Sequence, residues 1–371
     1  MSLINRFMPD YSLRQVDRVP VEVEPDHAYR IVRGIDIQRL AFVRALFRLR
    51  TLPDRLQATF RHGSVPPVAS SRIEDITRTG SGFVLLGEEP GREVVVGSAG
   101  KFWQPTINFA SVTAETFSSF SDPGFGKLAW CLRVDPRAGG GSWVGVEVRV
   151  AATDAASLAR FRRYWWLIGR FSHAIRRGLL HTLVRELGAA DEEGRPVPGD
   201  PILPERRFQK THAVIIESPP SRVWPWLVQM GCRRAGWYSY DWADNGGIPS
   251  AEGIVPELQQ LSVGDILPAR PEGPGGFAVL QLEESRCLVL GSPSLEDGGD
   301  GSGEPRWRTT WAFLLEPIGD EATQLTVRVR ADYEPGPKMA LMLPAVAMAH
   351  ELMERRQLHN LRRRAEARPA T

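Results

Sequence analysis

The chain has 371 residues, of which 42% are hydrophobic and 24% are charged, and its net charge at pH 7 is +2. This length exceeds the roughly 250 to 300 residues at which one hydrophobic core stops growing, so two domains are expected. The small net charge excludes a global attraction to nucleic acid, and three scattered cysteines without a C-x-x-C pair argue against a disulfide framework or a zinc site.

No targeting or membrane segment is evident in the sequence. The first fifteen residues lack an apolar run of signal-peptide length, and no window approaches the ~18 apolar residues of a membrane span. A cytoplasmic protein is the resulting expectation.

The first half of the chain begins with residues 1–14, which we expect to be a loose N-terminal arm. Alternating Val19, Val21 and Val23 predict a strand, and helical spacing from Pro25 to residue 47 then predicts two short helices. A hairpin is predicted over residues 83–97, because Pro90 and Gly91 suit its turn.

Two longer strands and a long helix complete this half. Residues 130–135 and 144–150 alternate with the period of a half-buried strand, and a glycine cluster separates them. After Asp154, a good N-cap, the period becomes helical up to residue 187. The proline-rich and glycine-rich residues 188–205 are expected to be a linker.

The same pattern then returns. Trp311 follows Trp130 and Leu325 follows Val144 at one shared offset of 181 residues, and Pro220 starts a segment that mirrors the helix at Pro25. Two strands that share one offset indicate a duplication. The sequence therefore predicts domain 1 at residues 15–187, domain 2 at 206–366 and a tail at 367–371.

The order of elements in each copy is a strand, two short helices, antiparallel strands and a long C-terminal helix. Residues 223–231, 234–241, 256–259 and 264–265 resemble bacterial proteins of the SRPBCC superfamily, which includes START lipid-transfer domains, Bet v 1-like proteins and polyketide cyclases. Residues 87–93 and 161–165 resemble the companion domain of such proteins. The resemblance implies an α+β fold of two tandem helix-grip (Bet v 1/START-like) domains. Each would be a curved antiparallel sheet around a long C-terminal helix, with an apolar cavity beneath the helix.

Candidate ligand-binding residues include four aromatic residues on a loop after Gly231. They are Trp237, Tyr238, Tyr240 and Trp242. Rings with polar tips suit an apolar ligand that carries a few oxygens. The alternative is that they close one end of the core, with Asp241 as a helix N-cap.

Further candidates face the predicted long helices. Trp130 and Trp311 occupy equivalent strand positions on the helix side, and Trp165 lies on the apolar stripe of the first long helix. In the second long helix Met348, Leu352 and Met353 share an apolar face that Arg356 and His359 continue. One interpretation is that these residues line a cavity. The alternative is that the tryptophans pack in the core and that the end of the helix projects past the sheet.

No catalytic or cofactor motif is present. The sequence lacks G-x-S-x-G, a P-loop and a G-x-G-x-x-G between a strand and a helix, so no cofactor is expected. The zinc motif H-E-x-x-H is approached at His350, but position 354 is Glu, so no metal is expected. No nucleic-acid partner is expected from the arginine clusters, although a weak contact of the C-terminal arginines with a membrane surface or nucleic acid is an alternative. Trp166 and Leu167 lie off the helix stripe and suggest a contact between the domains, with surface exposure as the alternative.

Three functions remain open. The first is binding or carriage of a small hydrophobic or aromatic molecule in an apolar cavity. The second is an enzyme that resembles polyketide cyclases and aromatases, in which Tyr240, Asp241, Arg356 or His359 would move protons. The third is a structural interaction module without a ligand.

Overall fold

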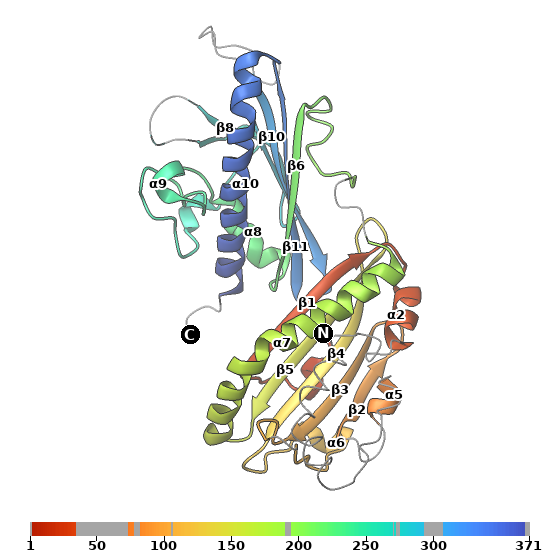
Figure 1. Cartoon of the computed structure of the whole chain (residues 1–371). Coiled ribbons are helices and arrows are strands. Elements are labelled where there is room, and N and C mark those ends of the chain that lie inside the picture. Colours follow the sequence, from red (N-terminus) through yellow and green to blue (C-terminus); the bar gives the residue numbers. More distant parts are fainter. Residues whose placement is uncertain are drawn as a thin grey trace. The chain divides into compact units, whose positions relative to one another are not determined.

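A computed structural model describes residues 2–34, 73–77, 82–104, 107–189, 194–269, 271, 275–292 and 307–367, without the side chains of residues 167–175, 307 and 338 (Figure 1). The chain forms two compact units, Met1–Ala190 and Asp191–Thr371. The predicted second short helix of domain 1, at residues 35–47, lies outside the described residues. None of the described helices is long and apolar enough to cross a membrane.

Unit 1 is a five-stranded antiparallel sheet with a long helix laid on one face (Figure 1). Its elements are α1 (Leu3–Phe7), β1 (Leu13–Val21), α2 (Pro25–Gly34), α5 (Ile73–Ile76), β2 (Val84–Glu89), β3 (Glu93–Gly100), α6 (Ala114–Phe117), β4 (Gly126–Pro136), β5 (Ser142–Ala152) and α7 (Ala155–Leu187). The strand order is β1-β5-β4-β3-β2. Helix α7 begins as expected, since the Asp154 carboxylate accepts a hydrogen bond from the Ser157 amide at 2.8 Å.

Unit 2 repeats this plan with one additional strand. Its elements are β6 (Phe208–Ile216), α8 (Pro220–Val228), α9 (Asp241–Asp244), η2 (Pro256–Leu258), β7 (Ile266–Pro268), β8 (Gly276–Glu283), β9 (Cys287–Gly291), β10 (Trp307–Ile318), β11 (Ala322–Tyr333) and α10 (Pro337–Glu366). The strand order is β6-β11-β10-β9-β8-β7. Without β7, this is the order of unit 1, so the predicted α+β fold of two tandem helix-grip domains is confirmed.

The two units share even a local irregularity. The pairing of β2 with β3 shifts register at Leu86, and the pairing of β8 with β9 shifts at Leu280. Each bulged leucine lies over a glycine of the next strand: a methyl group on Gly97 would lie 2.6 Å from Leu86 Cδ1, and one on Gly291 would lie 2.5 Å from Leu280 Cδ1. A side chain at Gly97 would force the Leu86 side chain to move, whereas one at Gly291 would also meet the Thr309 carbonyl oxygen at 2.6 Å, so glycine is the more strongly favoured at position 291.

The arm expected to be loose is ordered. Helix α1 packs on the sheet face opposite α7, where Ile4 and Met8 are buried with Cys131. The buried Glu93 carboxylate also accepts a hydrogen bond from the Leu3 amide at 2.8 Å. The arm covers this face because its outward residues, such as Val95, are apolar and need burial.

The stretch expected to be a linker has an equivalent role in unit 2. Val197 packs on the outer face of the sheet against Cys287 and Val289, and Leu203 is also buried. Residues before the first strand thus cover the outer face of the sheet in both units.

The core of unit 2 occupies only part of the space beneath α10. Leu358, Leu361 and Ala365, in the C-terminal half of this helix, pack with α8 and the inner face of the sheet. The N-terminal half carries the exposed Leu341, Met342 and Met348. The cavity described next lies beneath this half of the helix.

Candidate ligand-binding cavity

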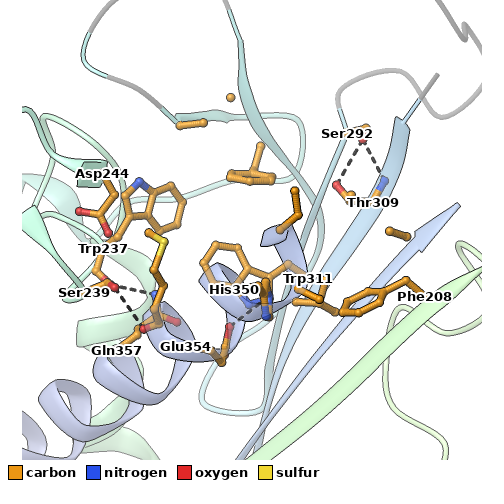
Figure 2. A pocket seen from close by; sticks show the side chains of 18 of the residues that line it. Phe208, Trp237, Ser239, Asp244, Ser292, Thr309, Trp311, His350, Glu354 and Gln357 are labelled. Atoms are coloured by element: carbon orange, nitrogen blue, oxygen red, sulfur yellow. Dashed lines mark hydrogen bonds and ion pairs between the residues drawn. The ribbon is translucent and has the colours of Figure 1, made fainter. Parts of the chain in front are cut away.

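Unit 2 contains a cavity of about 640 Å³ between the inner face of its sheet and α10 (Figure 2). Most lining residues come from β6, β8, β10, β11, α10 and the segment after α8, which is residues 229–265 between α8 and β7. The lining residues are Phe208, Trp237, Ser239, Asp244, Ala269, Gly275, Gly276, Phe277, Ser292, Thr309, Trp311, Val329, Ala331, Leu343, Val346, Ala347, His350, Met353, Glu354 and Gln357.

Three aromatic rings form one wall of the cavity. Trp237 stacks on Trp311 with 5.3 Å between ring centroids, and Phe277 meets both rings edge-on at 5.7 and 5.6 Å. The three residues come from separate parts of the chain, namely the segment after α8, β8 and β10. Stacked and edge-on rings hold one another in place, so the wall is rigid and apolar.

A row of polar side chains on α10 faces this wall. His350, Glu354 and Gln357 follow one another at helical spacing, and the Nε2 atom of His350 lies 3.5 Å from the Oε2 atom of Glu354. The side-chain amide of Gln357 donates to the Trp237 carbonyl at 2.8 Å. The remaining polar atoms find no hydrogen-bond partner among the described residues. They are Glu354 Oε1, Gln357 Oε1, His350 Nδ1 and Trp311 Nε1.

Burial determines the protonation of the His350–Glu354 pair. Glu354 is 3% exposed, and burial together with the charge of Glu351 raises its pKa to about 8, against a smaller opposing effect of the Trp311 indole. Burial also lowers the pKa of His350. The neighbouring His212 and Lys210 lower it further, whereas the Glu351 carboxylate raises it. At pH 7 the two groups therefore form a neutral carboxylic acid and a neutral imidazole, although their distance would also fit an ion pair.

Asp244 is a second buried carboxyl group on the cavity wall. It ends α9, its side chain lies beside Trp237, and it is 8% exposed (Figure 2). Neither of its carboxylate oxygens has a hydrogen-bond partner in the part of the chain that the structure describes. Burial and the charge of Asp241 raise its pKa to about 6, because they outweigh the nearby backbone amides.

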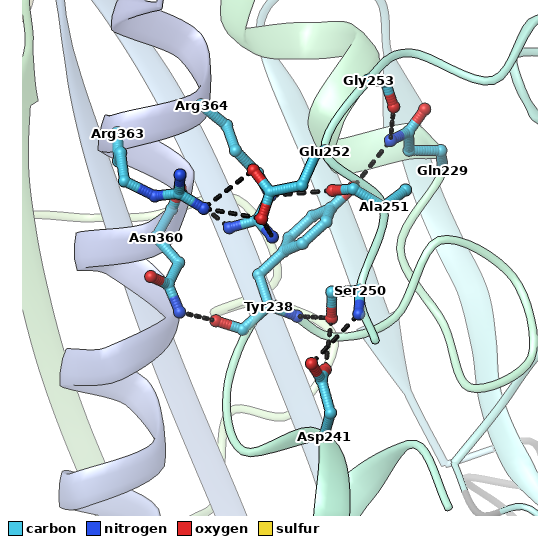
Figure 3. Close-up of polar contacts among 10 residues, drawn as sticks. All are labelled: Gln229, Tyr238, Asp241, Ser250, Ala251, Glu252, Gly253, Asn360, Arg363 and Arg364. Atoms are coloured by element: carbon cyan, nitrogen blue, oxygen red, sulfur yellow. Dashed lines mark hydrogen bonds and ion pairs between the residues drawn. The ribbon is translucent and has the colours of Figure 1, made fainter. Parts of the chain in front are cut away.

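Hydrogen bonds hold the segment after α8 against the helix (Figure 3). The Asn360 side chain donates to the Tyr238 carbonyl at 2.8 Å, and Arg364 donates to the Ala251 carbonyl at the same distance. The Arg364 guanidinium also lies 4.9 Å from the Tyr238 ring. Tyr238 has a left-handed backbone (φ 59°), a strained conformation that these contacts maintain.

The structure brings three of the predicted ligand-binding residues of domain 2 together at the cavity. These are Trp237, Trp311 and Met353. Tyr238 is instead a core residue, whose hydroxyl accepts a hydrogen bond from Gln229 at 2.8 Å and whose pKa burial raises. Tyr240 and Trp242 do not line the cavity: their rings pair with each other, and Trp242 is 79% exposed.

Only part of the predicted cavity face of α10 lines the cavity, since Met353 does but the other predicted residues do not. Met348 and Leu352 are 65% and 55% exposed, and Arg356 and His359 are also exposed. The prediction followed the apolar residues, whereas the face that points inward is marked by His350, Glu354 and Gln357. Polar residues at a buried position violate the usual pattern, and three of them at helical spacing were the signal that could have revealed this face.

The other candidates lie elsewhere. Asp241 accepts hydrogen bonds from the amide and hydroxyl of Ser250 at 3.0 and 2.5 Å and so supports the loop instead of facing the cavity. In unit 1, Trp130 packs against the core and Trp165 stacks on Phe161 at 5.6 Å. Trp166 is exposed, and the Leu167 side chain lies outside the described residues.

Metal binding finds no support in the described part of the chain. No three His, Cys, Asp or Glu side chains gather there in a group that could hold an ion. The pair of His350 and Glu354 is accompanied by an amide and an indole, which do not complete a zinc site.

Comparisons with known proteins gave only structural matches. No family model and no curated protein sequence matches the chain. The di-domain ARO/CYC BexL from the BE-7585A biosynthetic pathway is 11% identical, with 96% of this chain and 100% of that chain covered and a TM-score of 0.24. The di-domain ARO/CYC StfQ from the steffimycin biosynthetic pathway is 11% identical over 96% and 97% of the two chains, with a TM-score of 0.25. A conserved protein from Geobacillus kaustophilus is 15% identical over 43% of this chain and 95% of that chain, with a TM-score of 0.24. TM-scores this low do not establish a common fold. The architecture of the chain follows instead from the strand order of its two units.

Proposed function

We propose that unit 2 binds a small, largely apolar aromatic molecule with a few polar groups in the cavity beneath α10. The observation that carries this proposal is the set of buried polar atoms around the cavity that lack a described partner, on Asp244, Trp311, His350, Glu354 and Gln357. Each such atom costs about 1 to 3 kcal/mol when unsatisfied, and folded proteins keep few of them. Their concentration around one cavity is accounted for if a ligand supplies the missing partners.

The size and wall of the cavity support the same proposal. Its volume of about 640 Å³ is suited to a drug-sized molecule. The faces of Trp237 and Trp311 offer planar surfaces to an aromatic ring system, and Met353 adapts to ligands of different shape. A cavity of this kind disfavours the third sequence-based hypothesis, which requires filled interiors.

We also propose that the chain belongs to the SRPBCC superfamily. The sequence resemblance of residues 223–241 and the repeated sheet with a terminal helix support it. Scaffolds of this type hold binders and enzymes alike, so the fold by itself does not decide between them.

A polyketide cyclase-like enzyme is a second candidate, favoured by the neutral pair of His350 and Glu354. In such a reaction His350 would accept a proton from a carbon next to a carbonyl, and Glu354 would donate its proton to the carbonyl or departing hydroxyl oxygen. A carboxylic acid kept protonated at pH 7 by burial suits the role of general acid. The four groups that the sequence nominated do not line the cavity, so they are not part of this proposal.

Binding is tested with the fluorescent neutral probe 1-pyrenemethanol and two matched variants of α10. Ala347 lines the cavity, and its neighbour Met348 is exposed. We expect A347W to fill the cavity and weaken binding roughly tenfold or more, and M348W to bind like the unchanged protein. Equal binding by A347W, with a melting temperature like that of M348W, would remove the cavity as the site.

Catalysis is tested separately by NMR, through deuterium exchange at the carbon next to the carbonyl of 1-tetralone. The enzyme candidate requires faster exchange with the protein present, and loss of that acceleration in E354Q while 1-pyrenemethanol still binds. No acceleration by the unchanged protein would leave binding as the proposed function.

A further inference from the structure

Asp244 stands apart from the His350–Glu354 pair and is not needed for the proton transfers described above. Its carboxylate lies beside Trp237 on the wall that the segment after α8 contributes (Figure 2). It is more than nine-tenths buried, and neither oxygen has a described hydrogen-bond partner. A buried carboxylate without a partner is unfavourable, so this position favours a ligand group that brings hydrogen-bond donors or a positive charge.

The unfilled polar atoms of the cavity are unequally divided between donors and acceptors. Both oxygens of an ionised Asp244 and the Oε1 atom of Gln357 can only accept a hydrogen bond, and Trp311 Nε1 can only donate one. The neutral imidazole of His350 and the protonated carboxyl of Glu354 can do either. Among the described lining residues there is no lysine or arginine. The cavity is thus unsuited to a carboxylate, sulfonate or phosphate ligand and suited to a donor-rich or cationic one.

The aromatic wall adds a second attraction for positive charge. The faces of tryptophan, tyrosine and phenylalanine attract ammonium groups, and tryptophan is the strongest of the three. Trp237, Phe277 and Trp311 meet within 6 Å of one another on the same wall as Asp244. A carboxylate beside such rings neutralises the charge of a bound ammonium group. It has no hydrogen-bond donor of its own that would compete with the ammonium.

We propose that the cavity selects aromatic ligands that carry a protonated amine, and that Asp244 binds the ammonium group beside Trp237. This inference rests on the proposed binding function and specifies the chemical class of the ligand.

The ionisation of Asp244 supports this selection at neutral pH. Its pKa of about 6 leaves the carboxylate mostly charged at pH 7 and mostly neutral below about pH 5. The titratable neighbours are Asp241, which raises this pKa, and the buried thiol of Cys232, whose own pKa is raised by burial; Arg233 lies beside that thiol. The preference for an ammonium is therefore expected to weaken as the pH falls through 6.

The experiment compares three pyrene probes of matched size by fluorescence titration of the full chain. They are 1-pyrenemethylamine, which is protonated at pH 7, 1-pyrenemethanol, which is neutral, and 1-pyrenecarboxylate, which is an anion. The unchanged protein is expected to bind the ammonium roughly tenfold or more tightly than the alcohol, and the carboxylate most weakly. D244N, which keeps the shape of the side chain, is expected to lose the preference, so that it binds the ammonium and the alcohol with similar affinity.

A matched control separates a local effect from general attraction of positive charge. E257Q removes an exposed carboxylate outside the cavity and should keep the preference. A preference that survives in D244N, or a preference that is absent from the unchanged protein while the alcohol binds, would overturn the inference and leave the binding function intact. Failure of all three probes would overturn the proposed function itself.

Discussion

His350 and Glu354, one turn apart on α10, place a neutral imidazole 3.5 Å from a buried, protonated carboxyl group. An acid and a base this close would normally exchange a proton and form an ion pair. Burial prevents the exchange here, because it raises the pKa of the acid to about 8 and lowers that of the base. The proton on the Glu354 carboxyl group therefore lies at the edge of a cavity, where a ligand can reach it.

The stability of unit 2 should depend on pH through Glu354. The pKa of Glu354 in the folded state is about 8, above its ordinary value of 4.5. Its contribution to the free energy of unfolding is therefore fully present below pH 4.5 and is lost as the pH rises through 8. The free energy of unfolding should fall by up to about 1.4 kcal/mol per pH unit in this window from this group alone. E354Q cannot ionise and should remove that slope.

Amide hydrogen exchange of β10 and β11 as a function of pH measures this slope in unit 2, and exchange of β4 and β5 provides an internal control in unit 1. An identical slope in E354Q and the unchanged protein would show that Glu354 titrates normally.

The indole of Trp311 should tune the same acid. Its N–H group faces Glu354 and lowers the pKa of the carboxyl, although it does not meet the geometry of a hydrogen bond. W311F keeps an aromatic ring and removes the N–H, so the pKa of Glu354 should rise above 8. Carbon-13 NMR titration of the Glu354 carboxyl carbon measures this shift. W130F, at the equivalent strand position of unit 1, should leave the titration unchanged.

Gly291 should be intolerant of any side chain. A methyl group there would lie 2.5 Å from Leu280 Cδ1 and 2.6 Å from the Thr309 carbonyl oxygen, which belongs to the backbone and cannot move aside. We expect G291A to destabilise unit 2 by roughly 1 to 3 kcal/mol. Chemical denaturation, followed by hydrogen exchange in β9, measures the loss. The matched control is G253A, where a methyl group meets nothing within 4 Å, and a comparable loss in both variants would refute the steric explanation.

Asp241 should prove to be a structural residue. Its carboxylate accepts both the amide and the hydroxyl of Ser250, and this hydroxyl in turn accepts the Tyr238 amide at 3.2 Å (Figure 3). D241A would leave these buried groups without the carboxylate, at a cost of about 1 to 3 kcal/mol. Thermal melting should show this loss, while affinity for 1-pyrenemethanol below the melting transition should change less than twofold. A selective loss of affinity without loss of stability would instead assign Asp241 to the site.

The repeated architecture was readable from the sequence because it depends on periodicity. Alternating apolar residues of the strands, the cap at Asp154 and the shared spacing of Trp130 and Trp311 are local signals, and each follows from which side of an element must be buried. The sequence also singled out Trp237, because several large rings on one loop are unusual, and the structure places this residue on the cavity wall.

The sequence by itself determined that the chain contains two copies of a sheet with a terminal helix, because hydrophobic burial imposes a period on every strand and helix. Only the tertiary structure decided which face of α10 turns inward. The inward face carries the polar His350, Glu354 and Gln357 beside apolar lining residues such as Ala347 and Met353, and it faces an aromatic wall that is built from three distant segments. The pKa of Glu354 and the isolation of Asp244 arise in the same way, since the charge environment of a group is fixed only when separate segments come together.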